Sequence, residues 1–96
     1  MKSNRPEAIP TIQIDNERVI VTQWRFPAGA ETTWHTHQYD YVVVPQTTGQ
    51  LEIESSTGVT KSDLIAGVSY SREKGMHHNV VNPNASEFVF IEIELK

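Results

Sequence analysis

Short β-prone segments, separated by glycine, proline and other turn residues, recur along the chain at intervals near ten residues. No apolar pattern with the 3.6-residue period of a helix continues for long, and the frequent Gly and Pro residues interrupt helices of ordinary length. About eight short strands at this spacing predict an all-β barrel or sandwich. The expected strands cover residues 18–26, 35–37, 40–44, 50–54, 59–64, 68–72, 78–82 and 88–95.

The chain length of 96 residues predicts a single domain that covers residues 1–96. Residues 1–9 are polar, and we expect either a frayed tail or an arm that joins the sheet of a neighbouring subunit. A core of this size is small, and the last expected strand carries an apolar face formed by Val89, Ile91, Ile93 and Leu95. Burial of that face against a second copy of the chain predicts a homodimer.

Charge and composition exclude several classes of partner. Twelve acidic residues against eight basic ones give a net charge of -4, and no Lys/Arg cluster provides the electrostatic surface that nucleic acids require. No apolar stretch approaches the ~18 residues of a membrane span. The absence of cysteine excludes disulfides and thiolate zinc sites. The N-terminal residues lack the apolar run of a signal peptide, so we expect a cytoplasmic protein without nucleic-acid or membrane partners.

The four histidines form two pairs, and both pairs lie in expected strands. His35 and His37 alternate with Trp34 and Thr36, so both imidazoles point to one face of their strand. His78, in a later strand, can supply a third nitrogen from a facing position. Clustered polar surface residues are the alternative reading, because strands often face water on one side. Two His pairs in separate β segments favour a metal site with open coordination positions.

The spacing of these residues resembles the two motifs of the cupin family. In the first motif, Gly29 is followed by five residues, then by His35, one residue and His37, and Gly49 closes the motif. In the second motif, Gly67 is followed by five residues, then by Glu73-Lys74-Gly75, two residues before His78, and Asn82 after three more. Glu73 stands where cupins carry proline. The resemblance covers residues 29–82 and implies a double-stranded β-helix barrel with a metal on His35, His37 and His78.

The acidic ligand of the first cupin motif has no direct counterpart in this chain. The expected Glu position falls on Tyr41 or Val42, and an allowance for a longer hairpin before Gly49 moves that position to Asp40. Asp40 either ligates the metal, binds it through water, or holds a ligand histidine in place. Without Asp40 as a ligand, the site resembles the three-His iron centres of thiol dioxygenases in the same superfamily. We keep Asp40 as a fourth candidate ligand.

The resemblance implies a small metalloenzyme that acts on a small polar metabolite in the manner of a dioxygenase. Histidine nitrogens, with or without one carboxylate, suit Fe, Mn, Ni, Cu or Zn, and the sequence does not choose among these metals. Similar short single-domain cupins are associated with amino-acid and β-alanine breakdown. A metal-dependent isomerase or lyase, and a cupin that binds a small molecule without turnover, remain alternatives.

Overall fold

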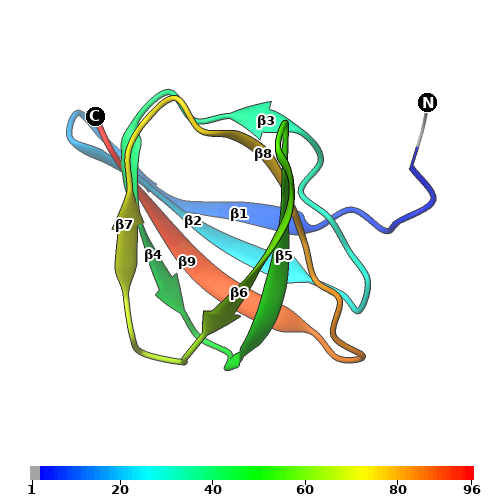
Figure 1. Ribbon diagram of the computed structural model, residues 1–96. Helices are drawn as coiled ribbons and strands as arrows, with labels where there is room; N and C mark the ends of the chain where they lie inside the picture. Colours follow the sequence, from blue (N-terminus) through cyan, green and yellow to red (C-terminus); the bar gives the residue numbers. More distant parts are fainter. Residues whose placement is uncertain (1–2) are drawn as a thin grey trace.

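A computed structural model describes residues 3–96 and contains nine strands within that range (Figure 1). All strand pairs are antiparallel. One sheet has the order β1-β2-β9-β4-β7, and the other has the order β3-β8-β5-β6. The all-β prediction is confirmed. The strands are β1 (Ile9–Asp15), β2 (Val19–Phe26), β3 (His35–Thr36), β4 (Asp40–Pro45), β5 (Gly49–Ser55), β6 (Gly58–Leu64), β7 (Tyr70–Arg72), β8 (His77–Val81) and β9 (Phe88–Leu95).

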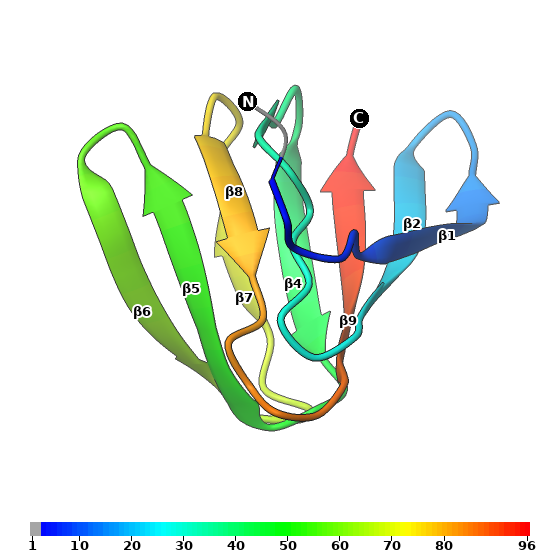
Figure 2. The same cartoon turned by 90° about the vertical axis from the view of Figure 1, so that its right-hand side faces the viewer.

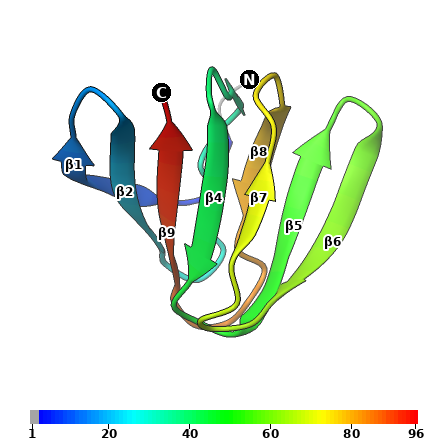
Figure 3. The same cartoon turned by 90° about the vertical axis from the view of Figure 1, so that its left-hand side faces the viewer.

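Strand β1 was not expected from the sequence, although Ile12 and Ile14 show the alternation of a strand. It pairs with β2 and lies at one edge of its sheet, whose other edge is β7, while β6 is an edge strand of the second sheet (Figures 2 and 3). The segment before β1 contacts its own barrel: Ala8 N donates to Glu31 O over 2.8 Å, and Glu31 N donates to Pro6 O over 2.9 Å. Residues 1 and 2 of the expected tail or arm lie outside the described residues.

The core fills the space between the two sheets. Strands β2, β4 and β9 direct alternate residues inward, as the two-residue period of a strand requires. Phe26 and Phe90 are almost fully buried, and their ring centroids lie 5.4 Å apart. The other buried apolar residues packed around these rings are Ala8, Ala30, Tyr41, Val43, Leu51, Leu64, Val80 and Phe88.

The outward face of the five-stranded sheet is also apolar. The residues that alternate with the core positions on β2, β4 and β9 are mostly aliphatic, and the single chain leaves them only partly buried. Leu95 at the end of this face is 45% exposed. This face therefore has the composition of a surface that packs against another surface. Its aliphatic members include Val19, Val21, Val42, Val44, Val89, Ile91, Ile93 and Leu95.

Two residues of the cupin-like motifs have structural roles. Asn82 is completely buried, and its Nδ2 donates to Phe26 O, Pro27 O and Ser86 O over 3.1, 3.2 and 2.9 Å. These bonds join the end of β2 to the loop before β9. Gly49 lies against Phe88, and a Cβ atom there would come within 3.2 Å of the ring.

Among residues 3–96, no helix is long and apolar enough to cross a membrane.

Candidate metal centre

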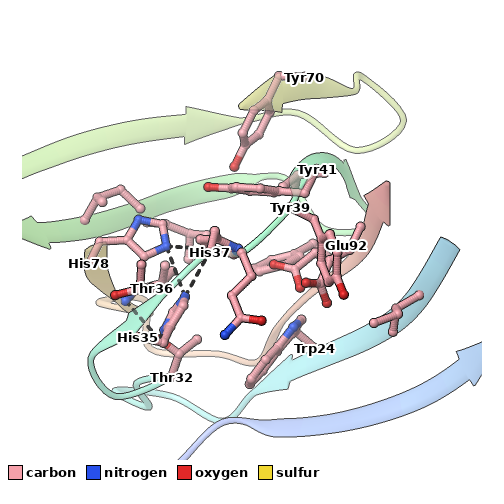
Figure 4. A pocket seen from close by; sticks show the side chains of 18 residues that line it. Trp24, Thr32, His35, Thr36, His37, Tyr39, Tyr41, Tyr70, His78 and Glu92 are labelled. Carbon is pink, nitrogen blue, oxygen red and sulfur yellow. Dashed lines mark hydrogen bonds between the residues drawn. The ribbon is translucent and has the colours of Figure 1, made fainter. Parts of the chain in front are cut away.

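Three histidine side chains converge on one point inside the barrel. The Nε2 atoms of His35 and His37 lie 3.2 Å apart, those of His37 and His78 lie 3.0 Å apart, and those of His78 and His35 lie 3.1 Å apart. Their rings meet edge to face (Figure 4). The structure therefore brings together the three histidines that the sequence predicted as ligands.

Two backbone contacts bring these histidines together. Strand β3 is only two residues long, and its pairing with β8 places His35 directly opposite His78. His37 follows β3 and is held to the turn before β8, because its N–H donates to Met76 O over 2.9 Å and its carbonyl accepts from Gly75 N over 2.8 Å. Gly75 has a φ of 96°, a conformation that glycine adopts without strain. The glycine of the second motif thus positions His37 of the first.

Neighbouring groups orient the rings. His35 Nδ1 lies 2.8 Å from Thr33 O, and a carbonyl can only accept, so Nδ1 carries the proton and neutral His35 has a free lone pair on Nε2. Thr33 has a φ of 77°, which is unusual for a β-branched residue. The ring of His37 stacks on Tyr41 with a centroid distance of 3.9 Å. His78 Nδ1 is buried and has no hydrogen-bond partner among residues 3–96.

The spacing of the three nitrogens fits one metal ion. Two ligand nitrogens at about 2.1 Å from a metal are about 3.0 Å apart when they subtend a right angle, and about 3.4 Å apart at the tetrahedral angle. The observed separations of 3.0–3.2 Å are closer to the right-angle value. Three ligands on one face leave other coordination positions open for a substrate. The residues present therefore fit a divalent transition metal.

Burial keeps two of these imidazoles neutral. Burial is the largest cause that lowers the pKa of both His37 and His78 from 6.5 to about 4 in the metal-free protein. The neighbouring His35 lowers both pKa values further, and His37 and His77 add to the effect on His78. A neutral imidazole is the form that binds a metal. Both side chains are thus in their ligand form at neutral pH.

The histidines lie in the wall of a cavity with a volume of about 480 Å³. This cavity occupies the barrel interior, and aromatic and aliphatic side chains form most of its surface (Figure 4). No Lys or Arg side chain is among its lining residues within the described chain. The lining residues are Ile20, Trp24, Thr32, His35, Thr36, His37, Gln38, Tyr39, Tyr41, Val43, Leu51, Ile53, Tyr70, His78, Val80, Phe90, Glu92 and Glu94.

Two carboxylates in the cavity were not predicted as site residues. Glu92 and Glu94 point inward from β9, and their oxygens lie within 4.8 Å of each other and of a His37 ring nitrogen. Burial raises the pKa of Glu92 to about 7, and the charge on Glu94 adds to this rise. The Trp24 N–H lowers the pKa of Glu92, although its geometry falls short of a hydrogen bond. The alternation of Glu92 and Glu94 with Ile91 and Ile93 was the sequence signal that could have identified them.

Asp40 lies outside the histidine cluster. Strand alternation directs its neighbour Tyr41 into the barrel, so the Asp40 side chain is exposed on the other side of β4. Its Oδ1 accepts a 2.8 Å hydrogen bond from Lys74 N in the turn before β8. His77 also points away from the cluster, as the alternation with His78 predicts, and its Nδ1 lies 2.7 Å from Thr36 Oγ1.

A polar network supports the site from behind His35. Thr32 Oγ1 lies 3.3 Å from both His35 Nδ1 and Asn79 Oδ1. The buried Asn79 side chain donates to Glu31 over 2.8 Å and to Glu54 over 2.9 Å. Arg5 forms ion pairs of 3.1 Å with both carboxylates. The bond to Arg5 is the largest cause that lowers the pKa of Glu54, whereas for Glu31 burial opposes the lowering and the bond from Asn79 contributes more to it than Arg5 does. The network connects the segment before β1 to the ligand region.

Comparison with known proteins identifies the family. The chain is 53% identical over 94 residues to Beta-alanine degradation protein BauB of Pseudomonas aeruginosa, and the match covers 98% of this chain and 99% of that protein. It superposes on the crystal structure of a cupin domain from Bordetella pertussis with a TM-score of 0.96 and 61% identity, over 99% of both chains. The chain is a cupin.

More distant structures share the cupin fold. A protein with a double-stranded β-helix domain from Klebsiella pneumoniae superposes with a TM-score of 0.77 at 22% identity, over 99% of this chain and 81% of that one. The double-stranded β-helix that the resemblance to cupins implied is therefore confirmed. A search against models of protein families found no match.

The lowered pKa values predict a pH-dependent stability of the metal-free cupin. His37 and His78 titrate near 4 when folded and near 6.5 when unfolded, so between these values the unfolded chain binds more protons. Their neutral forms contribute fully to the free energy of unfolding above pH 6.5. This contribution is lost as the pH falls toward 4, and the loss is about 1.4 kcal/mol for each unit by which a histidine pKa is lowered. Urea unfolding at pH 7, 6, 5 and 4 measures the loss, and His37→Phe should reduce the slope.

Two features of this measurement isolate the histidines. Glu92 has a raised pKa, so its own contribution grows as pH falls from 7 to 4.5 and partly offsets the histidine loss. The difference between the wild-type chain and His37→Phe removes this term. His77→Phe, which changes an exposed neighbour with the smallest of the four effects on the pKa of His78, is the control and should change the slope less than His37→Phe. Equal slopes for the wild-type chain and His37→Phe would contradict the assignment.

Proposed function

We propose that this cupin is a metal-dependent enzyme that acts on a small polar metabolite, in the manner of a dioxygenase. The observation that carries the proposal is the set of three Nε2 atoms, 3.0–3.2 Å apart, in the wall of the cavity. His35, His37 and His78 would hold the metal. A bound divalent ion supplies Lewis acidity and open positions at which a substrate oxygen or O2 is polarised.

The chain's own residues would bind and orient the substrate. Aromatic rings of Trp24, Tyr41, Tyr70 and Phe90 form an apolar wall that excludes water around the reacting group. Thr33 would fix the orientation of His35 through its carbonyl. Asp40 would order the turn that precedes β8, because it accepts the hydrogen bond from Lys74. We therefore assign Asp40 a positioning role and not a place on the metal.

The volume of the cavity and the similarity to BauB support the proposed substrate class. The volume of about 480 Å³ admits a small metabolite. The identity to a protein named for β-alanine degradation, over nearly the full length of both chains, supports a substrate from β-alanine or amino-acid breakdown. The lack of lining Lys or Arg among residues 3–96 disfavours a phosphorylated substrate. The absence of cysteine supports action in the cytoplasm.

A metal-dependent isomerase or lyase is the second candidate. Such reactions need a general acid or base, and one whose pKa lies near the working pH is the most effective. Glu92 has a pKa raised to about 7 by burial and lies beside the candidate metal ligands. This carboxyl group could move a proton on a substrate in the cavity without consumption of oxygen.

The metal content of the purified protein tests the histidine site. Protein purified without chelators and then saturated with Fe(II), Mn(II), Ni(II), Cu(II) or Zn(II) should hold one ion per chain. His78→Ala should lower the affinity by far more than tenfold, because it removes one of three imidazole ligands. Asp40→Asn and His77→Ala should retain the wild-type affinity, since both side chains point away from the cluster. Elemental analysis after dialysis measures each stoichiometry.

The metal results also separate the ligand sets. A large loss of affinity in Asp40→Asn would return Asp40 to the first coordination sphere. Normal binding by His78→Ala, with the fold preserved in circular dichroism spectra, would remove the histidine cluster from the metal site and with it the proposed function.

Oxygen consumption distinguishes the two enzyme classes. Addition of β-alanine and related small amino acids to the Fe(II)-loaded cupin should cause oxygen uptake in proportion to product, as an oxygen electrode records. His78→Ala should abolish this uptake, whereas His77→Ala should leave it unchanged. Conversion of a compound without oxygen uptake would favour the isomerase or lyase, and tight binding without conversion would favour a non-catalytic binding protein.

We also propose that the protein is a homodimer. The interface would be the apolar outward face of β2, β9 and β4, which includes Val21, Val42, Ile91 and Ile93. Light scattering at micromolar concentration should give twice the chain mass of 10.9 kDa.

A substitution on that face tests the interface. Ile91→Glu should convert the dimer to a monomer, because it places a charge in the centre of the apolar surface. Val59→Glu, a matched change at an exposed position of β6 in the other sheet, should keep the dimer. A wild-type mass of one chain would contradict the proposal.

A further inference from the structure

The two carboxylates on β9 have no compensating charge in the cavity. Glu92 is only 8% exposed. The Trp24 N–H acts on its carboxylate, but with a geometry that falls short of a hydrogen bond. Glu94 lies one position nearer the end of the same face, and burial raises the pKa of its carboxyl group as well. A buried carboxylate that lacks a partner is costly, so this pair favours a cation or a strong hydrogen-bond donor beside it.

The basic side chains of residues 3–96 lie outside the cavity. The Lys96 ammonium is 2.9 Å from Asp15, and the Arg25 guanidinium is 2.9 Å from Glu87. Lys96 acts on Glu94 only at longer range, where it slightly lowers the pKa of that carboxyl group. None of the described Lys or Arg residues lines the cavity. Within residues 3–96, Glu92 and Glu94 therefore face the cavity without a basic side chain beside them, and a cationic group of a ligand would match them.

The rest of the cavity wall also suits an ammonium group. Trp24, Tyr41, Tyr70 and Phe90 present aromatic rings to the same cavity. Aromatic faces attract cations through their quadrupole, and this attraction strengthens when the cation is desolvated. The Trp24 N–H has no hydrogen-bond partner among residues 3–96. It is therefore available to donate to an oxygen atom of a ligand.

We propose that the cavity recognises small metabolites that carry a primary ammonium group, which binds at Glu92 and Glu94 while the other end of the molecule faces the three histidines. The proposal rests on the metal-dependent function proposed above and names the substrate class of that site. Glu92 and Glu94 are then specificity residues: they select the amine and leave the reacting end to the metal. A second metal ion on His37, Glu92 and Glu94 is the competing interpretation.

A pair of matched compounds tests the ammonium site. We choose β-alanine (3-aminopropanoate) and butanoate. The two compounds have the same length and the same carboxylate, and β-alanine has an ammonium group where butanoate has a methyl group. Calorimetric titration of the Mn(II)-loaded full-length chain at pH 7.5 should show about 10- to 100-fold tighter binding of 3-aminopropanoate, as expected for a hydrogen-bonded charge pair. The same titrations on the metal-free chain test the carboxylates alone.

Variants assign the preference to the carboxylates. The double variant Glu92→Gln with Glu94→Gln should bind the two compounds with affinities within about threefold of each other, and should still hold one metal ion. Glu17→Gln, which removes one negative charge at an exposed turn position outside the cavity, is the control for the single variant Glu94→Gln and should keep the full preference. If the double variant does not fold, the single variant Glu94→Gln and the comparison of compounds on the wild-type chain decide the question.

Each outcome supports or overturns the proposal. Equal affinities for the two compounds, or a preference that survives in the folded double variant, overturn it. Two Mn(II) ions per wild-type chain, or loss of the single ion in the double variant, also overturn it, because Glu92 and Glu94 are then metal ligands. If the chain binds no metal but still prefers the ammonium compound, the carboxylate site is supported and only the metal-dependent function fails.

Discussion

The pairing of β3 with β8 is the contact on which the whole site depends. Two residues of β3 suffice to place His35 opposite His78, and the bonds of His37 to Met76 and Gly75 add the third ring. Three imidazoles at van der Waals distance would repel one another if charged, and burial keeps His37 and His78 neutral. The convergent set of ring nitrogens is therefore formed without an ion, so little reorganisation would accompany metal binding.

The barrel manages its polar interior in two different ways. Behind His35, each polar group has partners: Thr32, Asn79, Glu31, Glu54 and Arg5 form one connected network. On β9, in contrast, Glu92 has no hydrogen bond of good geometry within residues 3–96, and burial raises its pKa to about 7. Satisfied networks rigidify a structure, whereas unsatisfied buried groups indicate a place where a ligand acts. The contrast separates the supporting side of the site from the side that would contact substrate.

The five-stranded sheet serves two surfaces at once. Its inner face carries the aromatic core and the carboxylates, and its outer face carries aliphatic residues on the same three strands, β2, β9 and β4. Alternation therefore couples the two surfaces, since each residue that lines the cavity has neighbours that point outward. Packing of the outer face against a second copy would also restrain the strand that carries Glu92 and Glu94.

Local sequence determined much of this protein. β-branched residues between turns specified the strands, and strand alternation placed His35 and His37 on one face. The cupin motifs are matched in spacing by Gly29, His35, His37, Gly67, Gly75, His78 and Asn82, and this resemblance implied the fold. Strand β1 was not predicted, because Pro10 and polar neighbours obscure the alternation of apolar and polar residues. Pairing with β2 stabilises this strand. The environment of Asp40 and Glu92 was decided by tertiary structure alone. Both are acidic residues in strands, and strand alternation says only which neighbours share a face. Which face becomes the barrel interior depends on how the two sheets close, and that closure exposes Asp40 and buries Glu92 beside His37.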